Sequence, residues 1–373
     1  MQPDFDIEHY NERLNELFSR FQSVQKVGFT GSAYKPGLSG MESFSALLGN
    51  PWKSYPCIHV AGTNGKGSVC SMLASALASG RRVGLYTSPH LLDFRERMKI
   101  VSVDGFEMIS REEVWEFLNS YEAEFEGLSF FEITTGMAFW WFARRGVDAA
   151  VIEVGLGGRL DSTNIITPVL SVVTSIGLDH CALLGSTRAE IAFEKAGIFK
   201  PGVPAMVGVR DAETAPVFEE VAGRVGCPLV FASDLPAVTI RDSVFASESE
   251  LLARMDLTGP CQDINLHTVL VALENVDLPQ KQPELGKVVV PEGVPSPKTV
   301  EIGEGSGPEG GTFPENGQNW GRSQIESICS TAERTGLWGR WQKVSGDPEV
   351  ICDIGHNPPA LKENFARLDA LQR

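Results

Sequence analysis

The chain has 373 residues, 42% of them apolar and 21% charged, which is enough for two domains with a sizeable core and excludes a single small module or a wholly disordered chain. Lys and Arg total 32 against 48 Asp and Glu, a net charge of −16. This balance gives no broad cationic surface for a phosphodiester backbone, so nucleic acid is disfavoured as the main partner.

The seven cysteines are spread along the chain without a Cys-x-x-Cys pair, so we expect reduced thiols in a cytoplasmic protein and no zinc site. The N-terminus is acidic and polar and lacks the basic and apolar regions of a signal peptide. The richest apolar run, residues 133–142, is far shorter than the ~18 residues of a membrane span. We therefore expect no membrane association.

Short β-branched runs alternate with helical stretches from residue 57 onward. The pattern predicts helices at 69–79, from Ser110 with Glu113 as its capping box, and at 132–145. It predicts strands at 57–61, 83–86, 147–154 and 169–176. This order is typical of an α/β protein with a parallel sheet and helices on both faces. We assign residues 1–255 to one large domain and 256–282 to a linking helix.

The composition changes after the linking helix. Between Pro283 and Gly321, 15 of 39 residues are Gly or Pro, which predicts a mobile segment. A helix at 323–334, a segment at 336–342, a strand at 350–353 and a final helix follow. Residues 322–373 are too few for these elements to complete a second α/β domain, so we expect an incomplete one.

A glycine-rich turn joins the strand at 57–61 to the next helix. Its glycines allow backbone N–H groups to converge on an anion at the helix N-terminus, where the helix dipole adds partial positive charge. Lys66 can reach the β and γ phosphates of a nucleotide, and Ser68 can cap the helix or reach a metal. The turn therefore predicts a nucleotide-phosphate site made of Gly62, Thr63, Asn64, Gly65, Lys66, Gly67 and Ser68.

Three further segments carry side chains suited to chemistry. Ser88-Pro89 follows the strand at 83–86, at the edge where parallel sheets bind ligands. Phe130 and Phe131 precede Glu132 and Thr134, a set that could stack on a flat heterocycle or simply begin a buried helix. Glu153 lies in an otherwise apolar strand, where either a divalent cation or a basic partner would offset the cost of its burial.

The turn Gly62-Thr63-Asn64-Gly65-Lys66 departs from the usual phosphate loop and resembles that of the Mur ligase superfamily. The added Gly67-Ser68 resembles its folate branch, the folylpolyglutamate synthases and dihydrofolate synthases. The same resemblance extends to further motifs, namely Glu153-Val-Gly-Leu-Gly-Gly-Arg-Leu-Asp161, Asp179-His180, Glu194-Lys-Ala-Gly-Ile198, Gly259-Pro-Cys-Gln-Asp-Ile-Asn265, Leu337-Trp-Gly-Arg340 and Asp353-Ile-Gly-His-Asn-Pro358.

The resemblance implies a Mur-ligase-like ATP- and folate-binding domain followed by an incomplete Rossmann-like C-terminal domain, the start of a glutamate-ligase domain. It implies two Mg²⁺ ions, with Ser88, Glu153, His180 and a carbamylated Lys195 as ligands. It implies that ATP contacts the loop together with Asn265, Arg340, Asp353 and His356. The folate contacts it implies are Phe130, Phe131, Glu132, Thr134 and Arg159, and the catalytic residues are Lys66, His180, Lys195 and Arg340.

The implied activity is an ATP-dependent ligase that adds L-glutamate to a folate or dihydropteroate carboxylate through an acyl phosphate, in a monomeric protein. An alternative stays open, because only 16 residues follow Asn357 whereas family members continue through further strands. In that alternative the chain is a shortened homologue that binds ATP and folate with little or no turnover. A cell-wall Mur ligase or a phosphate-loop kinase fits the folate-branch motifs poorly.

The composition of residues 283–321 generates a prediction for limited proteolysis of the purified chain. We expect the first cuts inside this segment, because Gly and Pro runs form no protected secondary structure. A stable N-terminal fragment with its phosphate loop should remain, as read by mass spectrometry. Digestion of the N-terminal region before this segment would contradict the prediction.

Overall fold

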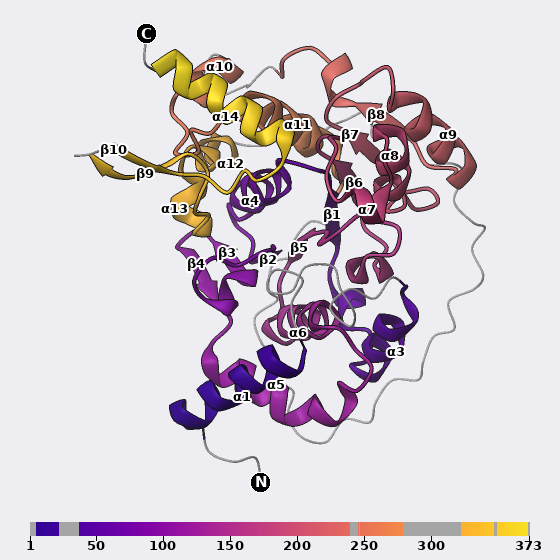
Figure 1. Ribbon diagram of the computed structural model, residues 1–373, viewed down its shortest axis with the longest axis vertical. Coiled ribbons are helices and arrows are strands. Elements are labelled where there is room, and N and C mark those ends of the chain that lie inside the picture. Colours follow the sequence, from indigo (N-terminus) through magenta and orange to yellow (C-terminus); the bar gives the residue numbers. More distant parts are fainter. Residues whose placement is uncertain are drawn as a thin grey trace, which may run out of the picture.

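The computed structural model describes residues 5–21, 37–238, 245, 247–278, 322–346 and 349–371 (Figure 1). The whole Gly/Pro segment predicted at 283–321, and the first four residues of the chain, lie outside this range. Within it, no helix is both long and apolar enough to cross a membrane.

An eight-stranded sheet of order β4-β3-β2-β5-β1-β6-β7-β8 forms the centre of the protein. The six strands from β2 to β8 along this order run parallel, and β3 and β4 add an antiparallel edge. The strands are β1 (Cys57–Ala61), β2 (Val83–Tyr86), β3 (Met98–Ser102), β4 (Gly105–Met108), β5 (Ala149–Glu153), β6 (Leu170–Val173), β7 (Ala205–Val207) and β8 (Leu229–Phe231). The predicted parallel sheet is confirmed.

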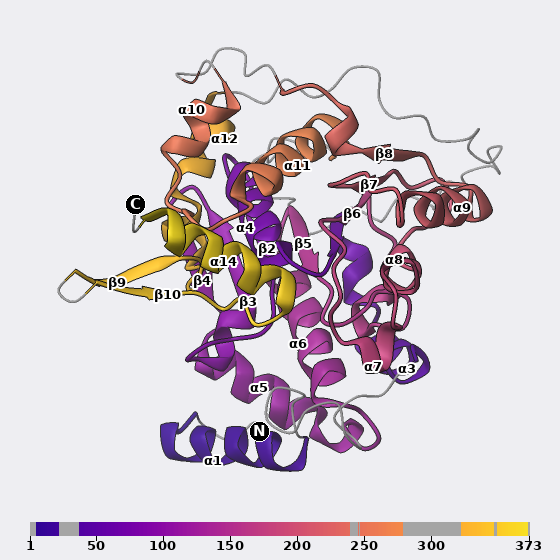
Figure 2. The same ribbon diagram turned by 45° about the horizontal axis from the view of Figure 1, so that its top comes forward.

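Helices cover both faces of this sheet, as predicted. Alternate residues of one strand enter opposite cores, since side chains of a strand point to opposite faces. Ile58 packs with α4 (Lys66–Leu77) and α11 (Gln262–Asn275), and its neighbour Cys57 packs with α6 (Phe130–Arg145) on the other side. Figure 2 shows α4 beside α11, with α6 on the opposite side of the strands.

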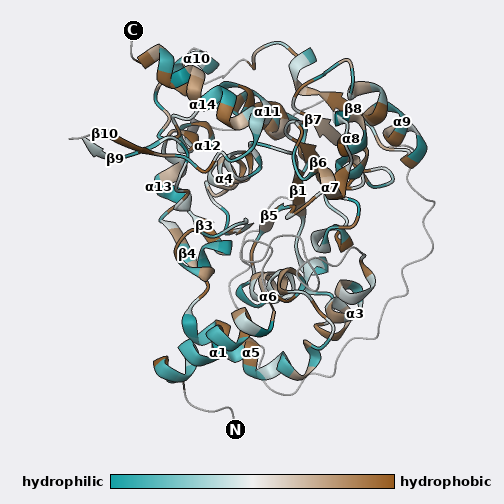
Figure 3. Cartoon of the chain, in the orientation of Figure 1, coloured by the Kyte–Doolittle hydropathy of each residue, from teal (hydrophilic) through white to brown (hydrophobic). Residues whose placement is uncertain are grey.

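Further helices surround these layers. The face of α6 also carries α1 (Ile7–Arg20), α3 (Ser39–Leu47) and α5 (Arg111–Tyr121). The β7–β8 end packs with α8 (Arg188–Ala196) and α9 (Ala215–Val225). Two further short helices are α7 (Cys181–Leu184) and α10 (Glu248–Ala253). In Figure 3 the central strands are hydrophobic and outer helices such as α1 are largely hydrophilic. The apolar side chains of the strands therefore lie between the layers.

Two helix starts follow from capping chemistry. Ser110 and Glu113 form the predicted capping box at the start of α5. The helix predicted from residue 132 begins two residues earlier, at Phe130, because Ser129 accepts from the N–H of Glu132 and the Glu132 carboxylate accepts from the N–H of Ser129. A capping box therefore fixes where the aromatic pair Phe130 and Phe131 enters the protein.

The antiparallel edge formed by β3 and β4 was not predicted. Both strands are short. Lys99 interrupts the apolar pattern of β3, and the exposed Glu107 interrupts that of β4. Asp104-Gly105 is the hairpin signal in this stretch. Polar edge strands resist pairing with other chains, which accounts for the weak apolar signal.

The C-terminal part contains α12 (Arg322–Glu326), α13 (Thr331–Thr335), the hairpin β9 (Gln342–Gly346) with β10 (Glu349–Cys352), and α14 (Pro358–Leu371). A 3₁₀ turn, Ser327–Ser330, divides the helix predicted at 323–334. Ser75 Oγ donates to Ser327 O at 2.7 Å and Ser327 Oγ donates to Ser75 O at 2.9 Å, so this turn is tied to α4. The domain boundaries stay a prediction.

Ile328 tests this packing, since its side chain is fully buried in the core of α4 and α11. Ile328→Ala should lower the free energy of unfolding by about 2–5 kcal/mol, through lost burial and a residual cavity. Val344→Ala on β9, where the side chain is 56% exposed, should change it by less than about 0.5 kcal/mol. Chemical denaturation measures both, and equal effects would show that the 3₁₀ turn does not belong to this core.

Candidate functional site

The turn between β1 and α4 is held from the strand beside it. The Thr63 N–H donates to Ser175 O at 2.7 Å, and Thr174 Oγ1 donates to Asn64 O at 2.6 Å. Gly65 has φ +84°, and a Cβ there would collide with Asn265 Oδ1, so both the backbone and the neighbouring helix require glycine at this position. The predicted loop therefore forms, with α4 beginning at Lys66.

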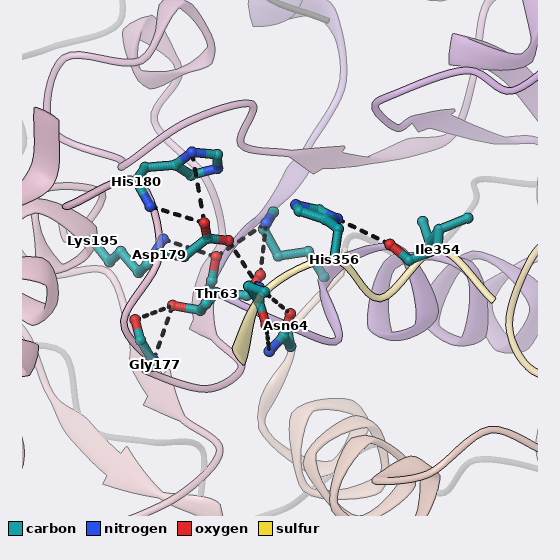
Figure 4. Close-up of polar contacts among 11 residues, drawn as sticks. Thr63, Asn64, Gly177, Asp179, His180, Lys195, Ile354 and His356 are labelled. Atoms are coloured by element: carbon teal, nitrogen blue, oxygen red, sulfur yellow. Dashed lines mark hydrogen bonds and ion pairs between the residues drawn. The ribbon is translucent and has the colours of Figure 1, made fainter. Parts of the chain in front are cut away.

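Two lysines, Lys66 and Lys195, converge on this turn, and Figure 4 shows Lys195 pointing toward it. Lys66 Nζ donates to Gly62 O at 3.1 Å and to Thr63 O at 3.2 Å, and Lys195 Nζ, arriving from α8, donates to Gly62 O at 2.8 Å. Burial, with the nearby Lys66 cation, lowers the pKa of Lys195 to about 7. The loop of a strongly acidic protein is thus locally cationic.

A buried carboxylate faces the same turn from the end of β5. Glu153 is 3% exposed, and its Oε2 accepts from the Ser88 N–H at 3.0 Å. Burial raises the pKa of Glu153, and the charges of Lys66 and Arg340 oppose that rise. The structure thus brings Ser88, Glu153 and Lys66 together, as the motifs predict.

Arg340 completes this cluster from the loop after α13. A Cβ on Gly67 would lie 2.9 Å from Arg340 Nη2 and 3.9 Å from Glu153 Oε2. Gly67 stands between Lys66 and Ser68, where the usual phosphate loop has no residue, and the close approach of the Arg340 guanidinium explains why this position is a glycine. Removal from water lowers the pKa of Arg340, while Glu153 and Asp353 raise it. A cavity of about 30 Å³ is lined by Gly67, Ser88, Glu153, Lys99 and Arg340, among others.

The loop after β6 carries Asp179 and His180. His180 has φ +51°, its N–H donates to Asp179 Oδ1 at 2.8 Å, and burial lowers the pKa of its half-buried ring. Figure 4 shows His180 and Lys195 on the same side of the phosphate loop. Among the described residues, no three His, Cys, Asp or Glu side chains gather closely enough to hold a metal ion.

The linking helix reaches the loop through a chain of side chains. Asn265, 8% exposed, donates from Nδ2 to Gln262 Oε1 at 3.0 Å, and Gln262 Nε2 donates to Ser68 Oγ at 3.3 Å. The predicted residues Asn265 and Ser68 are therefore joined by Gln262, whose role the sequence prediction did not include. Its position inside the quoted Gly-Pro-Cys-Gln motif was the available signal.

The C-terminal turn brings Asp353 and His356 to the site region. Asp353 accepts from the Trp341 N–H at 2.8 Å and from the Gly355 N–H at 2.8 Å, which fixes the turn next to Arg340. The His356 ring is exposed and its Nδ1 lies 2.9 Å from Ile354 O (Figure 4). Asn357, which the sequence prediction omitted, is 3% exposed and contacts the phosphate loop directly.

The predicted folate contacts separate into buried and exposed groups. Phe130 is 3% exposed and stacks on Phe18 with ring centroids 5.4 Å apart, while the half-buried Phe131 lies 6.0 Å from the Tyr86 ring. Thr134 Oγ1 lies 3.1 Å from the Tyr86 hydroxyl oxygen. A Cβ on Gly155 would lie 2.5 Å from Phe131 Cζ, so Phe131 packs against the glycine-rich strand end.

The two charged members of that set have other partners. The Glu132 carboxylate accepts from the N–H and Oγ of Ser129, at 2.7 and 2.8 Å, within the capping box. Arg159 is exposed and pairs with Glu194 at 2.8 Å. In this structure Glu132 therefore caps a helix, and Arg159 forms an ion pair.

Comparison with known proteins gives a consistent family. Residues 60–249 match the Mur ligase middle domain. The chain is 42% identical over 244 residues to the dihydrofolate synthase/folylpolyglutamate synthase of Bacillus subtilis, covering 62% of this chain and 56% of that protein, so it spans little more than half of this relative's length. It is 35% identical over 340 residues to the Escherichia coli enzyme of the same name, covering 90% of this chain and 69% of that protein.

A solved structure agrees with these matches. The E. coli FolC structure in complex with DHPP and ADP superposes with a TM-score of 0.70 at 30% identity, covering 97% of this chain and 74% of that one. The chain belongs to the folylpolyglutamate synthase/dihydrofolate synthase family of Mur ligases, whose members are ATP-dependent ligases.

Proposed function

We propose that the chain is an ATP-dependent ligase that joins L-glutamate to the carboxylate of a folate or of dihydropteroate. The observation that carries the proposal is the convergence of Lys66, Arg340 and buried Glu153 at the first turn of α4. Cations placed next to a carboxylate at a phosphate loop suit transfer of a phosphoryl group. The E. coli relative was solved in complex with ADP and DHPP, which supports a nucleotide and a second ligand beside it as the substrates of this site.

ATP would place its phosphates on the N–H groups of residues 62–68, where the N-terminus of α4 and Lys66 favour negative charge. Asn265 approaches Gly65 from α11, and Asp353 and His356 lie in the turn after β10. We propose these residues for the nucleoside side and Arg340 for the transferred phosphate.

The residues present fit a hard cation such as Mg²⁺. Glu153 offers a buried carboxylate beside Ser88, and both line the small cavity next to Gly67. We propose that these two residues hold one ion together with phosphate oxygens, and that His180 and Lys195 hold a second. Bound Mg²⁺ would neutralise charge that develops on the transferring phosphate.

Lys195 can act as an oxygen ligand only after modification. A pKa of about 7 leaves a large share of its amine neutral at physiological pH, and a neutral amine can attack carbon dioxide. The new N–C bond releases a proton and gives an anionic carbamate. We propose this form for Lys195, since a free ammonium cannot bind a cation.

The proposed reaction has two steps. A carboxylate oxygen of the pteroate or folate attacks the γ-phosphorus and ADP leaves, which forms an acyl phosphate. The glutamate amine then attacks the acyl carbon, phosphate leaves, and an amide remains. Lys66 and Arg340 stabilise the charge of the transferring phosphate. Phe131 and Thr134, beside Tyr86, would contact the flat ring of the acceptor.

Amide formation from labelled glutamate tests this proposal directly. The full chain should release one phosphate for each glutamate joined to dihydropteroate or to a folate, and neither product should form without ATP. A chain that binds ADP and pteroate by calorimetry but yields no amide would replace the ligase with the binding-only alternative.

Lys66→Ala should lower the rate of amide formation by about 100-fold or more, because it removes a cation from the developing charge while leaving the glycine turn intact. Lys53→Ala, which removes an exposed lysine on the 3₁₀ turn Pro51–Ser54, is the matched control and should retain the wild-type rate. A Lys66→Ala enzyme with near-normal kcat would refute the phosphate-loop assignment.

The pKa of Lys195 predicts how stability depends on pH. Its pKa falls from 10.5 to about 7 on folding, so above pH 7 the unfolded chain binds more protons than the folded chain. The stabilising contribution is therefore lost as pH falls through 7 and grows as pH rises toward 10.5. In carbon-dioxide-free buffer, the stability of the wild type relative to Lys195→Met should rise between pH 7 and 9. A constant difference would contradict the lowered pKa of Lys195 in the folded chain.

A further inference from the structure

Asn357 joins three segments that are far apart in the sequence (Figure 4 shows Asn64 and Asp179, two of its partners). Its Nδ2 donates to Asn64 Oδ1 at 2.9 Å and to Asp179 Oδ2 at 2.8 Å, and its Oδ1 accepts from Asn64 Nδ2 at 3.1 Å. The side chain is 3% exposed. One buried amide thus bonds to the phosphate loop and to the loop that carries His180.

The chemistry of the partners fixes which way this amide points. The carboxylate of Asp179 can only accept, so the amide nitrogen of Asn357 must face it. The Ala360 N–H can only donate, and it donates to Asn357 Oδ1 at 3.0 Å. With Asn357 oriented from both sides, the reciprocal pair with Asn64 has one possible arrangement, and both polar atoms of the Asn64 side chain are occupied.

We infer that Asn357 is a positioning residue, which seats the C-terminal turn on the phosphate loop and holds Asn64 and Asp179 in register for the nucleotide. This inference rests on the proposed function and deepens it. Its neighbour His356 is placed at the nucleotide site through this contact, and Asp179 also accepts from the His180 N–H. Asn357 itself touches no reacting atom in this account.

A simpler role must be separated from this one, because Asn357 also caps α14. Asp and Ser cap a helix about as well as Asn. Asn357→Asp keeps the cap, removes both amide donor bonds and places a carboxylate against Asp179. Asn357→Ser keeps the cap without adding charge. A residue that only caps α14 would therefore tolerate both substitutions.

The test uses the full chain and two readouts that need no turnover. Amide hydrogen exchange follows residues 62–68 and residues 358–371, and calorimetry gives the affinity for ADP. Asn357→Asp should raise exchange at 62–68 and weaken ADP binding by about tenfold or more, since charge-assisted hydrogen bonds are lost, while exchange in α14 stays near wild type. Asn357→Ser should show a smaller change of the same kind.

The double variant Asp179→Asn with Asn357→Asp restores one donor–acceptor pair with its polarity reversed, so it should recover part of the protection at 62–68 that Asn357→Asp loses. Wild-type exchange at 62–68 in both single variants would overturn the inference. So would a double variant no better protected than Asn357→Asp. If the wild type forms no amide, the exchange data still decide the role of Asn357, so the two proposals can fail separately.

Discussion

The closeness of charged groups at the first turn of α4 is the constraint on which the rest of the site depends. Lys66 and Lys195 donate to the loop carbonyls, and Arg340 lies over Gly67 beside the buried carboxylate of Glu153. Burial, with the nearby Lys66 cation, lowers the pKa of Lys195, and burial lowers the pKa of Arg340. Positive charge on these two side chains is therefore costly without a counter-charge. A polyphosphate would supply that counter-charge, which supports the proposal that the loop binds a nucleotide.

This arrangement requires two parts of the chain that are far apart in the sequence. The sheet supplies the loop and Glu153, while Arg340 comes from the segment after α13. Lys99 on β3 donates to Thr335 O at 2.7 Å and to Gly336 O at 2.9 Å, and so ties the end of α13 to the sheet four residues before Arg340. Residues 327–346 and 349–357 therefore complete a site to which the sheet alone supplies only part of the side chains.

Local signals in the sequence predicted what depends on local chemistry. The phosphate loop, the capping box at Ser110 and the burial of Glu153 each follow from neighbouring residues, and the structure confirms their placement. Partners distant in the sequence could not be predicted in the same way. Arg159 pairs with Glu194, 35 residues away, and Asn357 bonds to Asn64, 293 residues away. Ser129 stands three residues before Glu132, which is the spacing of a capping box. The sequence alone could not distinguish a capping Glu132 from one that contacts a ligand, because both assignments fit the same residues.

Oxygen transfer tests the central claim, that the cationic loop promotes attack of an acceptor carboxylate on the γ-phosphorus of ATP. Dihydropteroate labelled with ¹⁸O in its carboxylate should be incubated with the chain, Mg²⁺, ATP and L-glutamate, and the released phosphate analysed by mass spectrometry. An acyl phosphate carries one carboxylate oxygen to phosphorus, so the account predicts phosphate with one ¹⁸O for each amide formed. Amide formation with unlabelled phosphate would contradict it.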